Sequence, residues 1–128
     1  MILLDSDVAV DVLRGLPAAL AWFGVISGEH EIVVPGYVAM ELIFGCRDRQ
    51  DRRGCTTLLQ ACQLAWLDES NCQGALDLLA SIRPCAALGV IDALVAQTAR
   101  VMHIPLHTFN RKHYGFVPEL ELVEPYKR

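Results

Sequence analysis

The chain has 128 residues, and its 11 Lys and Arg against 15 Asp and Glu give a formal net charge of −4. Hydrophobic residues make up 53 % of it, which is too many for a disordered segment and enough for one buried core, so we predict a single domain over residues 1–128. The acidity argues against a protein that holds nucleic acid through bulk positive charge. It does not exclude an enzyme whose own carboxylates bind a metal ion.

The apolar runs and the cysteines indicate a cytoplasmic protein. The longest apolar run, residues 16–26, contains Pro17 and Gly24 and falls short of the ~20 residues that a membrane span needs. No basic stretch precedes the first apolar residues, which argues against a secretory signal. The five cysteines include no C-x-x-C pair, a poor pattern for a disulfide framework or a zinc site, so we predict reduced and mostly buried cysteines.

Short apolar runs alternate with helical patterns along the chain. In order, the patterns predict a strand at 1–4, a helix ending at Gly15, a helix from Pro17, a strand at 32–34, helices at 37–45 and 48–62 with a bend or break near Gly54, a strand at 64–67, helices at 69–82 and 90–103, and strands at 104–109 and 120–123. Glutamates alternate along the last strand, which is typical of a sheet edge. We therefore predict an α/β/α sandwich with a mainly parallel, about five-stranded sheet flanked by helices.

Polar residues stand at the ends of two of these strands. Asp5 comes directly after the first strand, and Thr108 and Asn110 lie at the end of the strand at 104–109. Because the carboxyl ends of parallel strands meet at one edge of a sheet, we expect these three side chains to approach one another there. The alternative for Asp5 is a structural role as a helix N-cap, which Ser6 would fill as well.

Further carboxylates stand in apolar helical contexts. Glu41 lies within VAMELIF (38–44), and its neighbours three and four residues away supply no cation. Burying an unpaired carboxylate is costly, so Glu41 either has a specific partner such as a metal ion or points to solvent at the helix edge. Asp7 and Asp92 lie in the first turns of their helices, where the helix dipole alone favours an anion. Carboxylates gathered together repel unless a cation lies between them, and such oxygen ligands suit Mg²⁺ or Mn²⁺.

Four short segments that span almost the whole chain carry these residues. They are ILLDSDV (2–8), VAMEL (38–42), IDALVA (91–96) and LHTFNRKHY (106–114). In this order and at this spacing they resemble the PIN-domain nucleases, and within that family the VapC-type toxins of bacterial toxin–antitoxin pairs. Each segment alone is a weak pattern, but all four in register make a specific one.

The resemblance implies a parallel sheet with flanking helices and a metal site on it. Asp5, Glu41 and Asp92 would hold one or two divalent ions, Mg²⁺ or Mn²⁺. A fourth position, acidic or Asn in the family, is Asn110 here, and Thr108 would support the site through its hydroxyl. Because Asn110 brings no negative charge, a tightly bound second ion is disfavoured.

The implied activity is that of a metal-dependent endoribonuclease, in which the ion lowers the pKa of a bound water and neutralises charge as a phosphodiester bond breaks. A homodimer and an inhibitory antitoxin are implied as partners, with the apolar helix at 18–25 as a candidate interface. The basic residues expected to contact RNA phosphates are Arg14, Arg47, Arg49, Arg111 and Lys112. For the arginines at 47–53 the alternative is a solvated helix face, since two aspartates partly neutralise them.

Three rival classes stay open on the sequence alone. An inactive PIN scaffold that only binds protein or RNA is compatible with Asn110. A receiver-like signalling domain would need a strand ending in Ser or Thr before the helix at 90, and residues 83–89 do not read as one. A haloacid-dehalogenase-like phosphatase would suit the Asp-Ser-Asp pattern at 5–7, but the chain shows no matching lysine and is short for that class.

Overall fold

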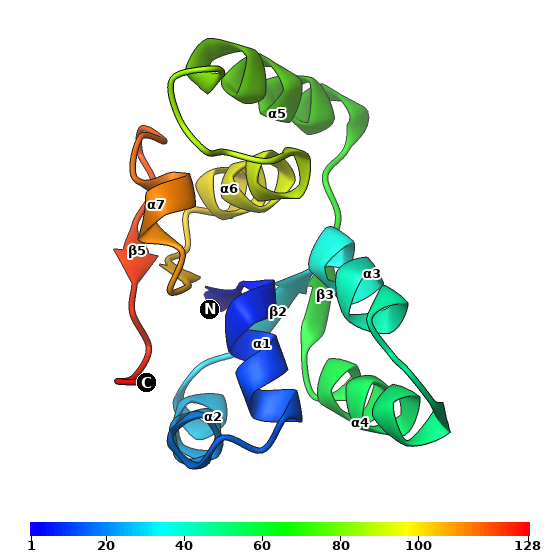
Figure 1. The fold of residues 1–128 in the computed structure, drawn as a ribbon. Helices are drawn as coiled ribbons and strands as arrows, with labels where there is room; N and C mark the ends of the chain where they lie inside the picture. The colour runs from blue at the N-terminus through cyan, green and yellow to red at the C-terminus, as the bar shows by residue number, and fades with distance from the viewer.

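A computed structural model describes all 128 residues as five short strands and seven helices (Figure 1). In chain order they are β1 (Ile2–Leu4), α1 (Ser6–Leu13), α2 (Pro17–Glu29), β2 (Ile32–Pro35), α3 (Gly36–Phe44), α4 (Arg49–Gln60), β3 (Gln63–Ala65), α5 (Glu69–Ile82), α6 (Val90–Met102), β4 (Leu106–His107), α7 (Arg111–Tyr114) and β5 (Leu122–Val123). The sheet order is β3-β2-β1-β4-β5, and all four neighbouring pairs are parallel. The predicted α/β sandwich is confirmed, and β5 is an edge strand as expected.

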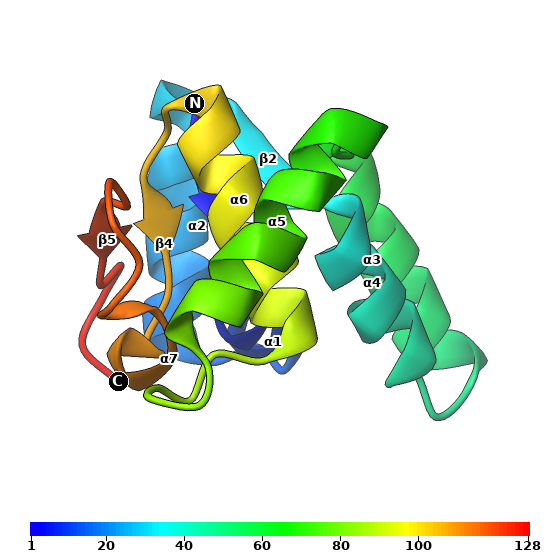
Figure 2. The same cartoon turned by 90° about the horizontal axis from the view of Figure 1, so that it is seen from above.

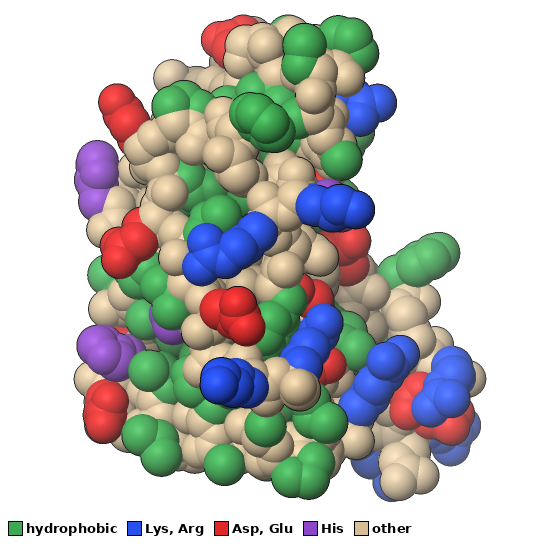
Figure 3. All heavy atoms as spheres, turned by 60° about the vertical axis from the view of Figure 1, so that its left-hand side comes forward, with side chains coloured by type: hydrophobic (Ala, Val, Ile, Leu, Met, Phe, Trp, Pro, Cys, Tyr) green, Lys and Arg blue, Asp and Glu red, His purple; other side chains and the backbone are tan.

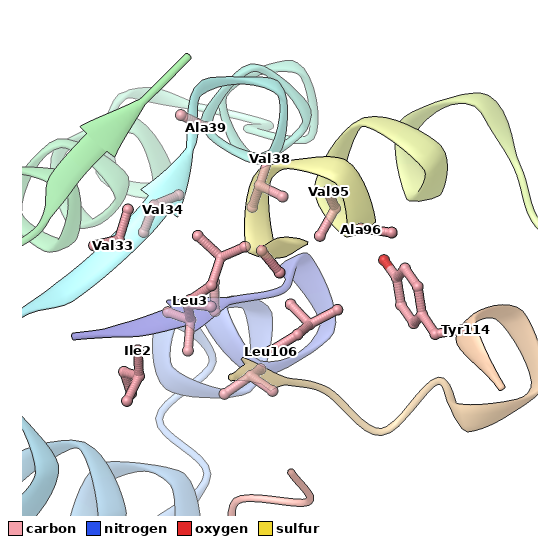
Figure 4. Close-up of a cluster of buried hydrophobic side chains, with 14 of the residues drawn as sticks. Ile2, Leu3, Val33, Val34, Val38, Ala39, Val95, Ala96, Leu106 and Tyr114 are labelled. Carbon is pink, nitrogen blue, oxygen red and sulfur yellow. The ribbon is translucent and has the colours of Figure 1, made fainter. Parts of the chain in front are cut away.

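Helices cover both faces of the sheet, which explains why β1 and β2 consist of apolar residues only. α5 and α6 lie on one side, and α1 and α2 lie on the other (Figures 1 and 2). Leu3 pairs with Val33 on one side and with Leu106 on the other, and all three side chains are fully buried (Figure 4). This register aligns the carboxyl ends of β1 and β4, so the residues that follow the two strands come out at one edge.

Most predicted boundaries differ by one to three residues from the observed ones, β4 and the unbroken α4 differ most, and the short helix α7 was not predicted. β4 covers only Leu106–His107, because α6 ends on His103 in a left-handed conformation (φ 55°) and the next two residues return the chain to the sheet. α4 runs unbroken through Gly54, because the buried side chains of Cys55 and Leu58 anchor that turn against the core.

The cysteines were expected to be mostly buried, and this is wrong. Cys55 alone is fully buried, and Cys85 is exposed. The remaining cysteines lie at helix ends, where one side of the chain faces solvent. No single helix is long and apolar enough to cross a membrane, and α1 and α2 reach the required length and apolarity only as a pair bent by 109°.

Candidate metal centre

Asp5 is the most deeply buried carboxylate of the chain, with 3 % of its surface exposed. Its Oδ1 accepts the Ser6 main-chain N–H at 2.8 Å, so it caps α1, and its Oδ2 accepts the Thr108 hydroxyl at 2.8 Å. No basic side chain forms an ion pair with it. Burial, with a smaller effect of neighbouring Asp7, raises the pKa of Asp5 to about 6. Asp5 is therefore both an N-cap and a buried anion without a compensating cation.

Thr108 and Asp7 hold the end of β4 against the start of α1. The Thr108 hydroxyl donates to Asp5 and accepts the Asn110 main-chain N–H at 3.0 Å. Asp7 Oδ2 accepts the main-chain N–H of Phe109 at 2.9 Å, which makes Asp7 more than a carboxylate in a first helical turn. The expected approach of the Asp5 and Thr108 side chains is thus found, and Asn110 joins them through its main-chain N–H. The roles of all three residues in catalysis stay predictions.

Asp92 begins α6 as part of a capping box. Its Oδ2 accepts the Gly89 main-chain N–H at 2.9 Å, and its Oδ1 accepts the Tyr114 hydroxyl at 3.3 Å. The Nδ1 atom of His113 lies 3.0 Å from Oδ2 but does not have hydrogen-bond geometry. The helix-start role weighed for Asp92 is therefore real, and it leaves Oδ1 with the Tyr114 hydroxyl as its partner.

Glu41 lies at the edge of α3 with its side chain exposed. The core-facing side of this helix consists of smaller residues, including Val38 and Leu42, while Phe44 projects into solvent. Partial burial and the charge of Asp92 raise the pKa of Glu41. Of the two alternatives from the sequence, Glu41 takes the solvent-edge position, yet it stands close enough to Asp92 for the two carboxylates to repel.

The donors fit a divalent cation in type and charge. Asp5, Glu41 and Asp92 offer carboxylate oxygens, the preferred ligands of Mg²⁺ and Mn²⁺. Burial, and then a neighbouring carboxylate, raise the pKa values of Asp5 and Glu41. No three Asp, Glu, His or Cys side chains stand close enough to hold one ion in the conformation described. The structure brings Asp5 to Thr108 and Glu41 to Asp92, with Tyr114 beside both Asp5 and Asp92.

Tyr114 and His113 were missed as contacts of Asp92. Both lie in the LHTFNRKHY segment, but helix α7 is too short to show a periodic pattern. The available signal was the position of Tyr114 four residues after Asn110, because in a helical turn that spacing puts both residues on one side.

A groove of about 870 Å³ opens beside this edge between α1, α3 and α4. Its lining includes Ser6, Glu41, Arg14 and Arg47, so it runs from the neighbour of Asp5 to two of the predicted RNA contacts. Arg47 Nε pairs with Asp51 Oδ2 at 2.9 Å on the outer wall. Figure 3 shows Lys and Arg side chains from the middle to the lower right of one face, with Asp and Glu side chains between them.

The remaining predicted RNA contacts are divided between two places. Arg49 begins α4, whereas Arg111 and Lys112 are exposed on α7, the helix that carries Tyr114. The basic residues therefore flank the carboxylates from both sides.

Thr108→Val tests the link between the two strand ends. Val has the same shape but cannot donate to Asp5 or accept from Asn110, so we expect the free energy of unfolding to fall by about 1–3 kcal/mol. Cleavage of RNA should fall roughly 10-fold or more, because the Asp5 carboxylate is no longer held in one orientation. Urea denaturation and a cleavage assay measure the two effects, with Thr57→Val on the exposed face of α4 as the control. Unchanged stability and cleavage in Thr108→Val would contradict this role.

The site lies beyond the carboxyl ends of parallel strands, as in other open α/β domains, and consists of carboxylates beside a groove whose lining includes Arg14 and Arg47. A sequence model of the PIN domain family matches residues 2–116. The chain belongs to this family.

Curated relatives and solved structures agree with this assignment. Ribonuclease VapC10 of Mycobacterium tuberculosis is 31 % identical, over 94 % of this chain and 91 % of its own. Ribonuclease VapC19 of the same organism is 29 % identical, over 94 % and 98 % of the two chains. The crystal structure of VapBC2 from Rickettsia felis bound to a promoter DNA fragment has a TM-score of 0.84, at 19 % identity and 96 % and 98 % coverage. A toxin–antitoxin complex from Klebsiella pneumoniae has a TM-score of 0.75, at 19 % identity over the whole of both chains.

These findings confirm the predicted PIN-like fold and the predicted VapC-type ribonuclease activity. They exclude the receiver-like and phosphatase classes, whose weak patterns arose because those folds also place an aspartate after a buried first strand. Nucleases of the PIN family depend on a metal ion, which confirms metal dependence.

Proposed function

We propose that the chain cleaves RNA as an endonuclease in the groove beside Asp5, Glu41 and Asp92, and that these carboxylates hold Mg²⁺ or Mn²⁺. The observation that carries the proposal is the buried Asp5 carboxylate, which lies at the carboxyl edge of the sheet without a cation. A structural N-cap needs only one carboxylate oxygen and no such burial. A metal ligand explains both the burial and the nearby pair of like charges at Glu41 and Asp92.

Some residues of the chain orient the carboxylates of the site, and others bind the RNA. The bound ion supplies a water of lowered pKa and positive charge to offset that of the breaking phosphodiester. Thr108 fixes the Asp5 carboxylate, and Asp7 fixes the end of β4 through the N–H of Phe109. Asn110, a neutral residue beside Thr108, keeps the count of full negative charges at three, which supports one tightly bound ion rather than two.

The groove supplies the RNA contacts in this proposal. Arg14 and Arg47 line it together with Glu41, so a phosphate bound to them would lie next to the carboxylates. Beyond the groove, the RNA backbone would contact Arg49 on one side and Arg111 and Lys112 on the other.

We expect Arg14→Gln and Arg47→Gln to raise the KM for RNA several-fold with a smaller effect on kcat, since each removes a phosphate contact. The salt dependence of binding should weaken by about one counterion per lost arginine. Arg83→Gln, in the loop after α5 away from the groove lining, is the control. Equal KM values for all variants would favour the solvated helix face instead.

An antitoxin and a second copy of the chain are the partners we propose. The Rickettsia felis and Klebsiella pneumoniae structures are toxin–antitoxin complexes, and an antitoxin segment that filled the groove would block RNA. For the homodimer, α3 offers three exposed apolar side chains, Met40, Ile43 and Phe44, and the helix at 18–25 offers Leu20 and Val25. The proposed location is the cytoplasm.

Cleavage of RNA oligonucleotides by the purified chain tests the proposed function. Cleavage is expected with Mg²⁺ or Mn²⁺, none in EDTA, and restoration when metal is added in excess. A matched DNA oligonucleotide tests the preference for RNA. Cleavage that persists in EDTA would overturn the metal-dependent mechanism. Metal binding without cleavage of any RNA would favour the inactive scaffold.

A further inference from the structure

Tyr114 is a buried tyrosine whose hydroxyl faces carboxylates rather than water. Its side chain is 1 % exposed and projects from α7 with the hydroxyl directed toward α6 (Figure 4). The hydroxyl donates to Asp92 Oδ1 at 3.3 Å, and Asp5 lies close enough for its charge and hydrogen bonding to act on the same group. Burial first, and then these two carboxylates, raise the pKa of Tyr114, so the hydroxyl keeps its proton and acts as a donor.

The Tyr114 hydroxyl lies next to both Asp92 and Asp5. Asp92 Oδ2 is held by the Gly89 N–H, and both oxygens of Asp5 accept hydrogen bonds, from Ser6 and Thr108. Tyr114 therefore lies beside two carboxylates that are otherwise held separately: it donates to Asp92 on α6, and it is close to Asp5, which follows β1. The hydrogen bond to Asp92, at 3.3 Å, is long for a hydroxyl donating to a carboxylate.

We propose that Tyr114 is a positioning residue whose hydroxyl, placed between Asp92 and Asp5, holds the two carboxylates ready to take up the divalent ion. This inference rests on the proposed function of the site. Two carboxylates facing a gap repel each other, and a neutral donor between them reduces that repulsion while the ion is absent. Once an ion binds, the hydroxyl can still donate to the second lone pair of Asp92 Oδ1 and fix its direction.

The alternative is that Tyr114 is an ordinary core tyrosine whose hydroxyl meets Asp92 only because a buried hydroxyl needs a partner. Both explanations predict some loss of stability when the hydroxyl is removed. Only the positioning role predicts weaker binding of the ion, because partners that orient metal ligands commonly change metal affinity by roughly 10–100-fold.

Tyr114→Phe tests the inference, with Tyr126→Phe as the matched control. Phe fills the same space as Tyr114. The Tyr126 hydroxyl makes a similar bond to Asp11 Oδ2 at 2.9 Å, and Asp11 is not one of the proposed metal ligands. Titration calorimetry with Mn²⁺ should give a Kd about 10-fold higher for Tyr114→Phe and an unchanged Kd for Tyr126→Phe. In the cleavage assay, Tyr114→Phe should need more Mn²⁺ for half-maximal rate and recover most of its rate at saturation.

Each outcome of the titration decides between the explanations. An unchanged or lower Kd in Tyr114→Phe, with the variant folded by circular dichroism, would overturn the positioning role and leave the proposed function standing. An equal rise in Kd for both variants would also overturn it, because the effect would then follow from general loss of stability. A wild-type chain that binds no Mn²⁺ would overturn the proposed function together with this inference.

Discussion

Asp5→Asn is expected to reduce RNA cleavage by at least about 100-fold while leaving the metal-free protein as stable as the wild type at neutral pH, or more stable. The amide oxygen can still accept the Ser6 N–H and cap α1, and the Thr108 hydroxyl can turn to accept from the amide. The substitution removes the buried negative charge. The ion needs this charge, but in the metal-free protein the charge lowers the free energy of unfolding.

The pH dependence of stability follows from the pKa of Asp5. Its pKa is about 6 in the folded chain against an ordinary 3.8, so the folded state binds the proton more tightly than the unfolded state. The stability from this proton is fully present below pH 3.8 and is lost as pH rises through about 6, by at most about 3 kcal/mol. The stability of Asp5→Asn should not fall in this way, because the amide does not titrate.

Urea denaturation in EDTA from pH 4.5 to 7.5 measures the effect as the difference between wild type and Asp5→Asn. We expect this difference to move in favour of the variant as pH rises. Asp77→Asn, on the exposed face of α5, should follow the wild type in both stability and cleavage. A constant difference across the range would show that Asp5 is not strained by burial, and retained cleavage in Asp5→Asn would exclude it as a metal ligand.

Asp92→Ala is expected to reduce RNA cleavage as strongly as Asp5→Asn does. Unlike Asp5→Asn, it should also lower the stability of the metal-free protein. Asp92 starts α6 by accepting the Gly89 N–H, and it accepts the hydroxyl of buried Tyr114, so its removal should lower the free energy of unfolding by about 1–2 kcal/mol.

Asp68→Ala is the matched control for Asp92→Ala. Asp68 caps α5 through the Asn71 N–H at 2.8 Å, so its loss should destabilise the chain by about 1 kcal/mol. Cleavage measured well below the melting temperature should be lost in Asp92→Ala and retained in Asp68→Ala. Parallel loss in both variants would mean that Asp92 acts through helix stability alone.

The contact between Asp5 and Thr108 was predictable because it follows from topology. Parallel strands end at the same edge, and the apolar run at 2–4 and the largely apolar run at 104–109 predict two strands of the sheet. The chain order of strands and helices then determined the fold class. Boundaries such as that of β4 were not predictable, since they depend on the left-handed His103 that ends α6.

The position of Glu41 and the role of Tyr114 lay beyond sequence patterns. α3 is apolar nearly all round, so its periodicity does not tell which side faces the core, and Glu41 proved to lie at the exposed edge. Tyr114 contacts Asp92 because α7 packs on α6. The two residues are 22 positions apart in the sequence, and α7 has only four residues. Such contacts depend on tertiary packing, for which a single sequence carries no periodic signal.

Calorimetric titration of Mn²⁺ into the wild type and Asp5→Asn at pH 7.5 tests most directly whether Asp5, Glu41 and Asp92 form a metal centre. We expect one ion to bind per wild-type chain, with binding lost or weakened at least about 100-fold in Asp5→Asn and unchanged in Asp77→Asn. Equal Mn²⁺ binding by all three proteins would contradict the metal centre at the carboxyl edge of the sheet.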